Sequence, residues 1–134
     1  VVGFLVGSDL NDTRVVGVCA YGEQASLLLL AMAHSPQLFA AVALLSPMGD
    51  APTDRLQKAE YPAALFAARS SDEESIKSNA LLWAGACRRL STSDRSRVFC
   101  MITPPMRQET FSDLKLKTLA YAFLIDSLSR SRSH

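Results

Sequence analysis

The sequence has few of the residues that hold metals or disulfide frameworks. Its three cysteines, Cys19, Cys87 and Cys100, form no CxxC pair, and the histidines are His34 and His134. A disulfide framework needs a denser, paired set of cysteines, and a zinc site needs Cys and His ligands at short spacing. We therefore expect no metal, no cofactor and a reduced, intracellular compartment.

The sequence also lacks an excess of charge of one sign and any long apolar run. Its 14 Lys and Arg and 13 Asp and Glu leave a formal charge of +1, and the longest apolar run covers 27–33. A membrane-spanning helix needs about 20 apolar residues, and a nucleic-acid surface needs clustered basic residues. We expect a soluble protein that neither binds nucleic acid nor inserts into a membrane.

The size and composition suit one globular unit. The chain has 134 residues, of which 49% are hydrophobic, enough for a packed core without disulfides. We expect a single domain over 1–128, followed by a polar tail at 129–134. Serine and arginine dominate that tail, which favours a solvated, frayed terminus.

Short apolar runs alternate with helical patterns along the chain. Buried strands are predicted at 14–19, 39–45, 62–68 and 97–102, where apolar residues follow one another without alternation. Helices are predicted at 1–10, 22–33, 71–90 and 112–128. Strands separated by helices imply a parallel sheet with helices on both faces. The expected fold class is α/β, a three-layer α/β/α arrangement around a mainly parallel sheet of about four strands.

Two of these helices carry more detailed predictions. Ser71 and Glu74 have the spacing of a capping box, which starts a helix. In the last helix, four residues fall on one side and are predicted to pack against the sheet: Leu114, Tyr121, Ile125 and Leu128.

One motif lies between a predicted strand and a predicted helix. Residues 17–22 read Gly-Val-Cys-Ala-Tyr-Gly. In a G-x-S-x-G motif the nucleophile occupies a sharp strand-to-helix turn, and the following backbone N–H stabilises negative charge. Here Cys19 takes the nucleophile position and Ala20 the oxyanion position, while Tyr21 replaces the usual second glycine.

The segment RVVGVCAYGEQASLLLLAMAHSPQLFAAVALLSP resembles the nucleophile elbow, following helix and next strand of the α/β-hydrolase superfamily. Cysteine at this position is found in its dienelactone hydrolase-like branch and in acyl-CoA thioesterase and acyltransferase relatives. The resemblance continues through FAARSSDEES and implies that Asp72 is the acid of a catalytic triad. It implies that the chain corresponds to the C-terminal half of such an enzyme.

The resemblance places the catalytic histidine in the loop at 103–108, where this sequence has none. Without an imidazole, the hydrolytic cycle loses its base and its acid together. We therefore expect a catalytically inactive domain that serves as a structural or interaction module, in which Cys19 is a packing residue and Asp72 a helix-terminus carboxylate. The alternative is an active cysteine-dependent hydrolase, thioesterase or acyltransferase whose histidine comes from elsewhere. A third interpretation, an anion- or nucleotide-binding turn, lacks a glycine-rich phosphate loop.

The resemblance also predicts an open edge of the sheet. In the superfamily's strand order, the strand from Arg14 to Cys19 borders the half-sheet that this chain lacks. An unpaired apolar edge is normally covered in soluble proteins. We expect a partner protein or a missing N-terminal half to cover this edge, the domain being incomplete on its N-terminal side.

Overall fold

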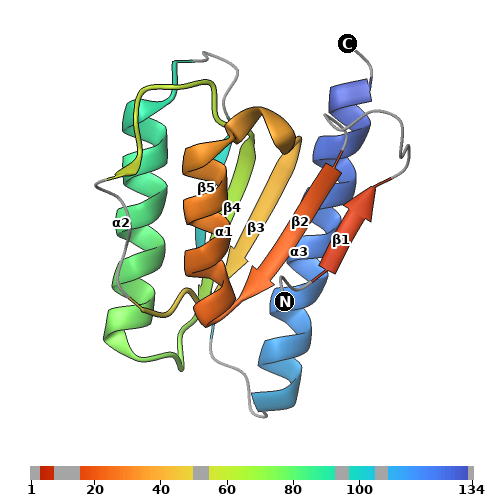
Figure 1. Cartoon of the computed structure of the whole chain (residues 1–134). Helices are drawn as coiled ribbons and strands as arrows, with labels where there is room; N and C mark the ends of the chain where they lie inside the picture. Colours follow the sequence, from red (N-terminus) through yellow and green to blue (C-terminus); the bar gives the residue numbers. More distant parts are fainter. Residues whose placement is uncertain (1–3, 8–15, 50–54, 93–96, 105–108, 133–134) are drawn as a thin grey trace.

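The computed structural model describes residues 4–7, 16–49, 55–92, 97–104 and 109–132. Five strands form one sheet: β1 (Phe4–Gly7), β2 (Val16–Tyr21), β3 (Ala41–Leu45), β4 (Ala63–Arg69) and β5 (Val98–Thr103). Their order in the sheet is their order in the chain (Figure 1). Strands β2 to β5 run parallel to one another, and β1 pairs antiparallel with β2. The predicted α/β class with a mainly parallel sheet is confirmed.

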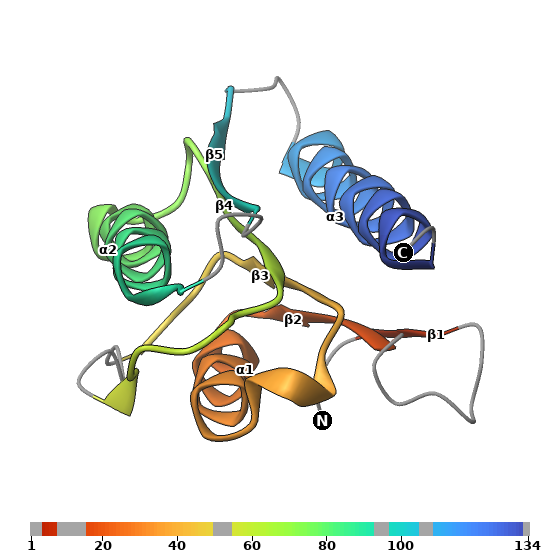
Figure 2. The same ribbon diagram turned by 90° about the horizontal axis from the view of Figure 1, so that it is seen from above.

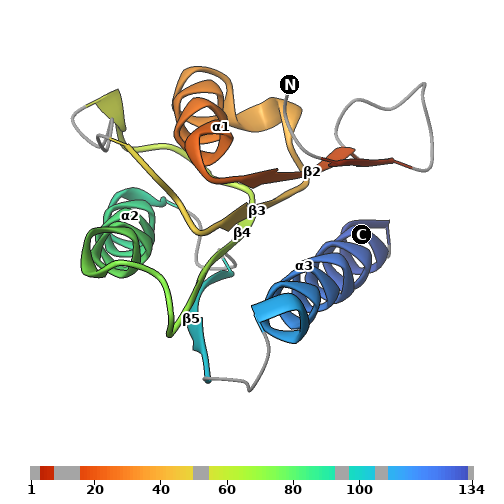
Figure 3. The ribbon, with the colours of Figure 1, turned by 90° about the horizontal axis from the view of Figure 1, so that it is seen from below.

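Helices lie on both faces of the sheet. They are α1 (Glu23–His34), α2 (Glu74–Leu90) and α3 (Glu109–Arg132), with a short 3-10 helix η2 (Pro36–Leu38) after α1. On one face α1 packs on β2 and β3, and α2 packs on β4 and β5 (Figure 2). On the other face α3 crosses β2, β3 and β4 (Figure 3).

Strands β3 and β4 are almost completely buried. All five residues of β3 are buried, and β4 is buried except at its two ends. Such uninterrupted apolar runs are typical of parallel strands covered on both faces. One core lies beneath α1 and α2 and contains Phe66 and Trp83, and the other lies beneath α3 and contains Leu45 and Leu116.

The helix predicted over 1–10 is wrong, because Phe4–Gly7 forms β1. Phe4 pairs with Cys19 and Gly7 with Val16. A short apolar run fits a helix or a strand equally well, and here hydrogen bonding to β2 decides. Strand β1 therefore covers the edge of β2 for which we expected a partner or a missing N-terminal half. Arg14, at the start of that predicted edge, lies outside the described residues.

The packed face of α3 also differs from the predicted one. The buried side chains are Leu116, Ala120, Leu124, Ser127 and Leu128, whereas Leu114, Tyr121 and Ile125 are exposed. Of the predicted face, only Leu128 is buried. Because α3 carries apolar residues on several sides, its spacing alone selects no face, and packing against the sheet makes the choice.

Two helix boundaries in the structure differ from those predicted from the sequence. Helix α2 begins at Glu74 after an N-cap at Glu73, whose side chain makes no capping hydrogen bond, so Ser71 is not at the N-cap position where the capping box was predicted. Helix α3 continues to Arg132, so the first four residues of the predicted tail, 129–132, are helical.

Candidate functional site

The turn between β2 and α1 is centred on Gly22. This residue has φ 68° and ψ −127°, which L side chains rarely adopt. Its N–H donates to the Leu45 carbonyl at 2.9 Å, and its carbonyl accepts from the Met48 N–H at 3.1 Å. These bonds hold the turn against the end of β3. The residue at the sharp strand-to-helix turn therefore carries no side chain.

Cys19 lies three residues before this turn, inside β2. It pairs with Ala43 on one side and Phe4 on the other, and only 6% of it is exposed. Its side chain belongs to the core beneath α3. Burial raises the pKa of the Cys19 thiol to about 11, and the nearby positive charge of Lys117 offsets only part of that rise.

The prediction that Cys19 stands at the turn is thus corrected, because the parallel pairing of β2 with β3 continues to Tyr21. Ala20 is likewise inside the strand, where it pairs with Leu44 and is fully buried beneath α1. The backbone N–H that follows the turn residue belongs to Glu23, not to Ala20. Because the motif has a glycine at each end, the sequence was compatible with a turn at Cys19 or at Gly22. The pairing of β2 with β3 places the turn at Gly22.

Asp72 lies at the carboxyl edge of the sheet, just after β4. One of its oxygens accepts hydrogen bonds from the Ser46 hydroxyl at 2.7 Å and from the Arg69 backbone N–H at 2.8 Å. The other accepts from Nη2 of Arg69 at 2.9 Å and from its Nε at 3.2 Å. Both carboxylate oxygens are therefore engaged by two residues of the same chain.

The electrostatics of Asp72 follow from these contacts. Burial by itself raises the pKa of this carboxyl, but the hydrogen bonds from the Arg69 N–H and the Ser46 hydroxyl, with the charge of Arg69, hold the pKa below its ordinary value. Asp72 is therefore ionised at neutral pH and bound to a fixed cation.

This network ties the ends of three strands together. Ser46 follows β3 with a positive φ of 44°, and the Arg69 guanidinium lies 5.9 Å from the centre of the Tyr21 ring at the end of β2. Ser46 and Arg69 were missed by the sequence analysis. A signal existed, since polar residues at the carboxyl ends of parallel strands converge on the region where α/β proteins bind ligands.

The histidine that the structure describes is remote from this edge. His34 ends α1, whose first residue follows the Gly22 turn. Twelve helical residues span about 18 Å, so the imidazole lies near the opposite edge of the sheet. His134 and the loop at 105–108 lie outside the described residues.

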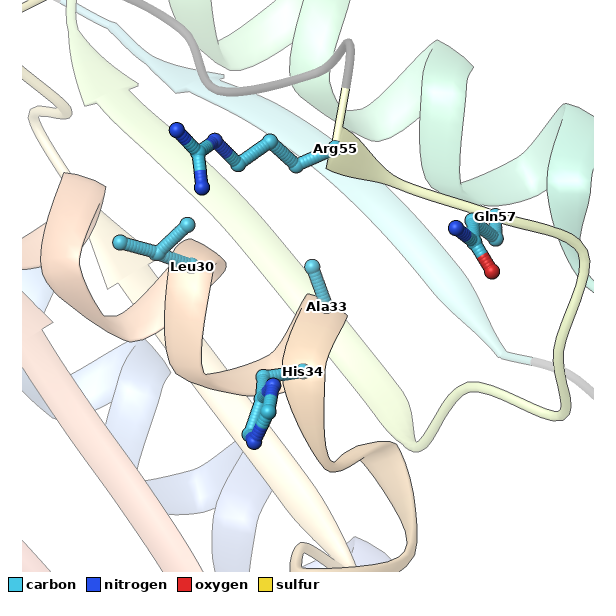
Figure 4. A pocket seen from close by; sticks show the side chains of 5 residues that line it. All are labelled: Leu30, Ala33, His34, Arg55 and Gln57. Carbon is cyan, nitrogen blue, oxygen red and sulfur yellow. The ribbon is translucent and has the colours of Figure 1, made fainter.

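His34 instead lines an open cavity of about 440 Å³ between α1 and the segment before β4. The other lining residues are Leu30, Ala33, Arg55 and Gln57 (Figure 4). Figure 4 shows the Arg55 side chain extending toward Leu30 and the His34 ring near the end of α1. The lining offers a guanidinium, an amide and an imidazole, but no Ser, Thr or Cys side chain.

Within the part of the chain that the structure describes, no group of three or more His, Cys, Asp or Glu side chains could hold a metal ion. No helix there is both long enough and apolar enough to cross a membrane.

The fold and the carboxyl edge of the sheet define a protein of the α/β class. The sequence matches no protein-family model, and no curated protein shows significant similarity to it.

The strain at the turn leads to a prediction about two glycines. Gly22→Ala is expected to lower the free energy of unfolding by about 1–2 kcal/mol, because a Cβ is strained at positive φ. Space is not the reason, since a Cβ there would meet Met48 Sδ at an ordinary 3.6 Å. Gly85→Ala is the control, because Gly85 lies inside α2 with nothing within 4 Å of an added Cβ.

Gly85→Ala should stabilise the protein by about 0.5–1 kcal/mol, because alanine is the better helix former. Urea unfolding followed by circular dichroism measures both variants. Equal effects of the same sign would show that Gly22 is not held in a strained conformation.

Proposed function

We propose that this chain is a catalytically inactive domain of α/β-hydrolase-like, three-layer architecture that serves as a structural or interaction module. The observation that carries the proposal is Gly22 at the strand-to-helix turn. An elbow nucleophile must project from this turn toward the substrate, and a glycine has no side chain to project.

The neighbouring groups support the same conclusion. Cys19 is buried beneath α3 with a pKa of about 11, so only about one part in ten thousand is thiolate at pH 7. Nucleophilic catalysis by cysteine depends on thiolate that a substrate can reach. A buried, protonated thiol in mid-strand meets neither condition.

The carboxylate of the implied triad has a different task. A triad acid orients an imidazole and stabilises its positive charge. Asp72 already accepts hydrogen bonds on both oxygens from Ser46 and Arg69. The carboxylate therefore serves to fasten the loops after β3 and β4, which is a structural role.

Cysteine labelling tests this proposal. In the native protein, Cys19 and Cys87 are expected to react with a small maleimide far more slowly than in urea, because both are buried. Mass spectrometry after pulsed labelling from pH 5 to 9 assigns each adduct, and the same reaction in urea supplies the unprotected rate.

The same samples are then incubated with an acyl thioester. We expect no acyl-enzyme at Cys19 and no turnover above that of Cys19→Ala. Multiple turnovers that disappear in Cys19→Ala would establish the cysteine-dependent hydrolase instead and overturn the proposed function.

A further inference from the structure

Strand β5 ends the sheet on the side opposite β1. No described strand pairs with its outer side. Seen from above, its outer side lies between α2 and α3 and is crossed by neither helix (Figure 2). Because α3 packs mainly on β2, β3 and β4, the α3-side face of β5 is also only partly covered.

The hydrogen bonds to β4 show which backbone groups of β5 point outward. The Ala64 N–H donates to the Arg97 carbonyl at 2.8 Å, and the Ser70 N–H donates to the Thr103 carbonyl at 3.0 Å. Along a strand the backbone groups alternate between its two sides. The carbonyl and amide groups of the even-numbered residues of β5 therefore point away from the sheet.

One of these outward groups is already satisfied. Arg88 of α2 donates through Nη2 to the Val98 carbonyl at 2.7 Å. The next two outward positions, Cys100 and Ile102, have no strand partner among the described residues. The edge thus offers two consecutive outward-facing residues for pairing, each with one backbone donor and one backbone acceptor.

The side chains of β5 do not protect this edge. Phe99, Met101 and Ile102 are exposed, and the strand sequence VFCMIT contains no charged residue and no proline. Exposed edge strands are usually guarded by Lys, Pro or a bulge, because an unprotected one pairs with another chain. This strand has the features of one that is paired.

Helix α2 presents a regular stripe beside the same edge. The Arg88 contact with Val98 identifies the side of α2 that faces the edge of β5. Leu81 and Glu74 lie seven and fourteen residues earlier, on that same side. Leu81 is 59% exposed, and Glu74 forms an ion pair with Lys77 of its own helix at 2.9 Å. From the N-terminus of α2, this stripe consists of an acidic, an apolar and a basic side chain: Glu74, Leu81 and Arg88.

We propose that this surface binds a second copy of the chain, with β5 of the two copies pairing antiparallel about a two-fold axis at Met101. In this register Cys100 of each copy exchanges both backbone hydrogen bonds with Ile102 of the other, and the Val98 carbonyl keeps its bond to Arg88. This antiparallel pair gives hydrogen-bond partners to the outward backbone groups of Cys100 and Ile102 in both copies. Its two-fold symmetry is the one that most homodimers have.

Helix α2 fits the same axis. The two counts start at the contact between Arg88 and Val98. From there to Leu81 is seven residues of helix, and to Met101 three residues of strand. Each distance is about 10 Å, so Leu81 lies roughly level with Met101. Since α2 packs on both β4 and β5, the two copies of α2 lie about two strand spacings apart, roughly 10 Å. This distance is in the range found between the axes of packed helices.

The charges of the stripe select this orientation. Antiparallel helices place Leu81 against Leu81 of the second copy at the axis, and Glu74 near Arg88 of that copy on either side. Both charged side chains are exposed. Arg88 holds the Val98 carbonyl through Nη2 and can reach Glu74 of the second copy through its other guanidinium nitrogens, while Glu74 would share its carboxylate between Lys77 and that arginine. A parallel arrangement would instead set like charges together, which is unfavourable.

The inference deepens the proposed function, because it identifies the partner of the interaction module as a second copy. Sedimentation equilibrium over a concentration series is the test, and the wild type is expected to be a dimer. Leu81→Arg puts two cations at the axis and should raise the dissociation constant by roughly a hundredfold. Leu82→Arg is the matched control, because Leu82 is 65% exposed but lies a further 100° around the helix from Leu81.

Leu82→Arg should leave the dissociation constant within about threefold of the wild type. A wild type that stays monomeric, or a dimer that Leu81→Arg and Leu82→Arg affect alike, would overturn the proposal. Hydrolase activity in a dimer would contradict the proposed function alone, so the two proposals fail separately.

Disulfide trapping tests the register. Facing residues without mutual hydrogen bonds in antiparallel strands have Cα atoms about 4.5 Å apart, close enough for a disulfide. Met101→Cys should therefore form a covalent dimer with diamide as the oxidant, and Leu82→Cys should not. Failure of Met101→Cys to cross-link in a solution dimer would overturn the axis at Met101.

Discussion

Leu124→Ala is expected to lower the free energy of unfolding by about 2–5 kcal/mol, whereas Ile125→Ala should change it by no more than about 0.5 kcal/mol. Leu124 is completely buried in the core beneath α3, and the adjacent Ile125 is 62% exposed. Removing a buried side chain loses its transfer free energy and leaves a cavity, and removing an exposed one does neither.

Urea unfolding of the two variants and the wild type provides the measurement, with the slope m checked for constancy. The pair is informative because the spacing of apolar residues predicts the opposite order. A larger loss for Ile125→Ala would mean that α3 packs on the sheet through the face predicted from the sequence, and the second core described above would be wrong.

Asp72→Ala is expected to destabilise the protein by about 3 kcal/mol, because it breaks a largely buried ion pair and leaves its partners unsatisfied. The side chains of Arg69 and Asp72 are only 15% and 5% exposed. The substitution strands the guanidinium of Arg69 and the buried hydroxyl of Ser46.

Asp126→Ala is the matched control. Asp126 also contacts two arginines, Arg97 and Arg130, but in an exposed position. Water and salt screen such a pair, so a much smaller effect is expected than at Asp72. Similar losses for the two aspartates would show that the Ser46–Asp72–Arg69 network does not stabilise the edge of the sheet.

The stabilisation by Asp72 is expected to depend on pH. Because the folded state lowers the pKa of Asp72 below the ordinary 3.8, its contribution is fully present above that value. It disappears as the pH falls through the lower pKa of the folded protein. The difference in unfolding free energy between wild type and Asp72→Asn should therefore be constant from pH 7 to about pH 5 and shrink below about pH 4. A difference that grows on acidification would contradict the lowered pKa.

These contacts also indicate what the carboxyl edge does in this protein. Gly22, Ser46 and Asp72 stand where an α/β enzyme assembles its reacting groups, yet each is used to hold one loop to another. Function resides in sites carried by a fold and not in the fold itself. The edge strand β5, which carries no such polar network, is the surface that we propose the protein uses.

Local patterns in the sequence determined the fold class and most of the elements. The apolar runs at 39–45, 62–68 and 97–102 correspond to β3, β4 and β5 within two residues at each end. Each run is short, apolar and bounded by polar or turn residues, and helical patterns separate the runs, so the local pattern predicts buried parallel strands. The same holds for α1 and α2, whose lengths and boundaries lie close to the predicted ones.

Only the tertiary structure decided how these elements are paired and which faces they bury. The register of β2 against β1 and β3 moves the turn from Cys19 to Gly22, and it makes a strand of Phe4–Gly7. The sheet selects one face of α3 from several apolar ones. Ser46 and Asp72, 26 residues apart, meet only because their strands are neighbours. Local propensity is a property of a few consecutive residues, whereas register and helix face depend on contacts between segments distant in the sequence.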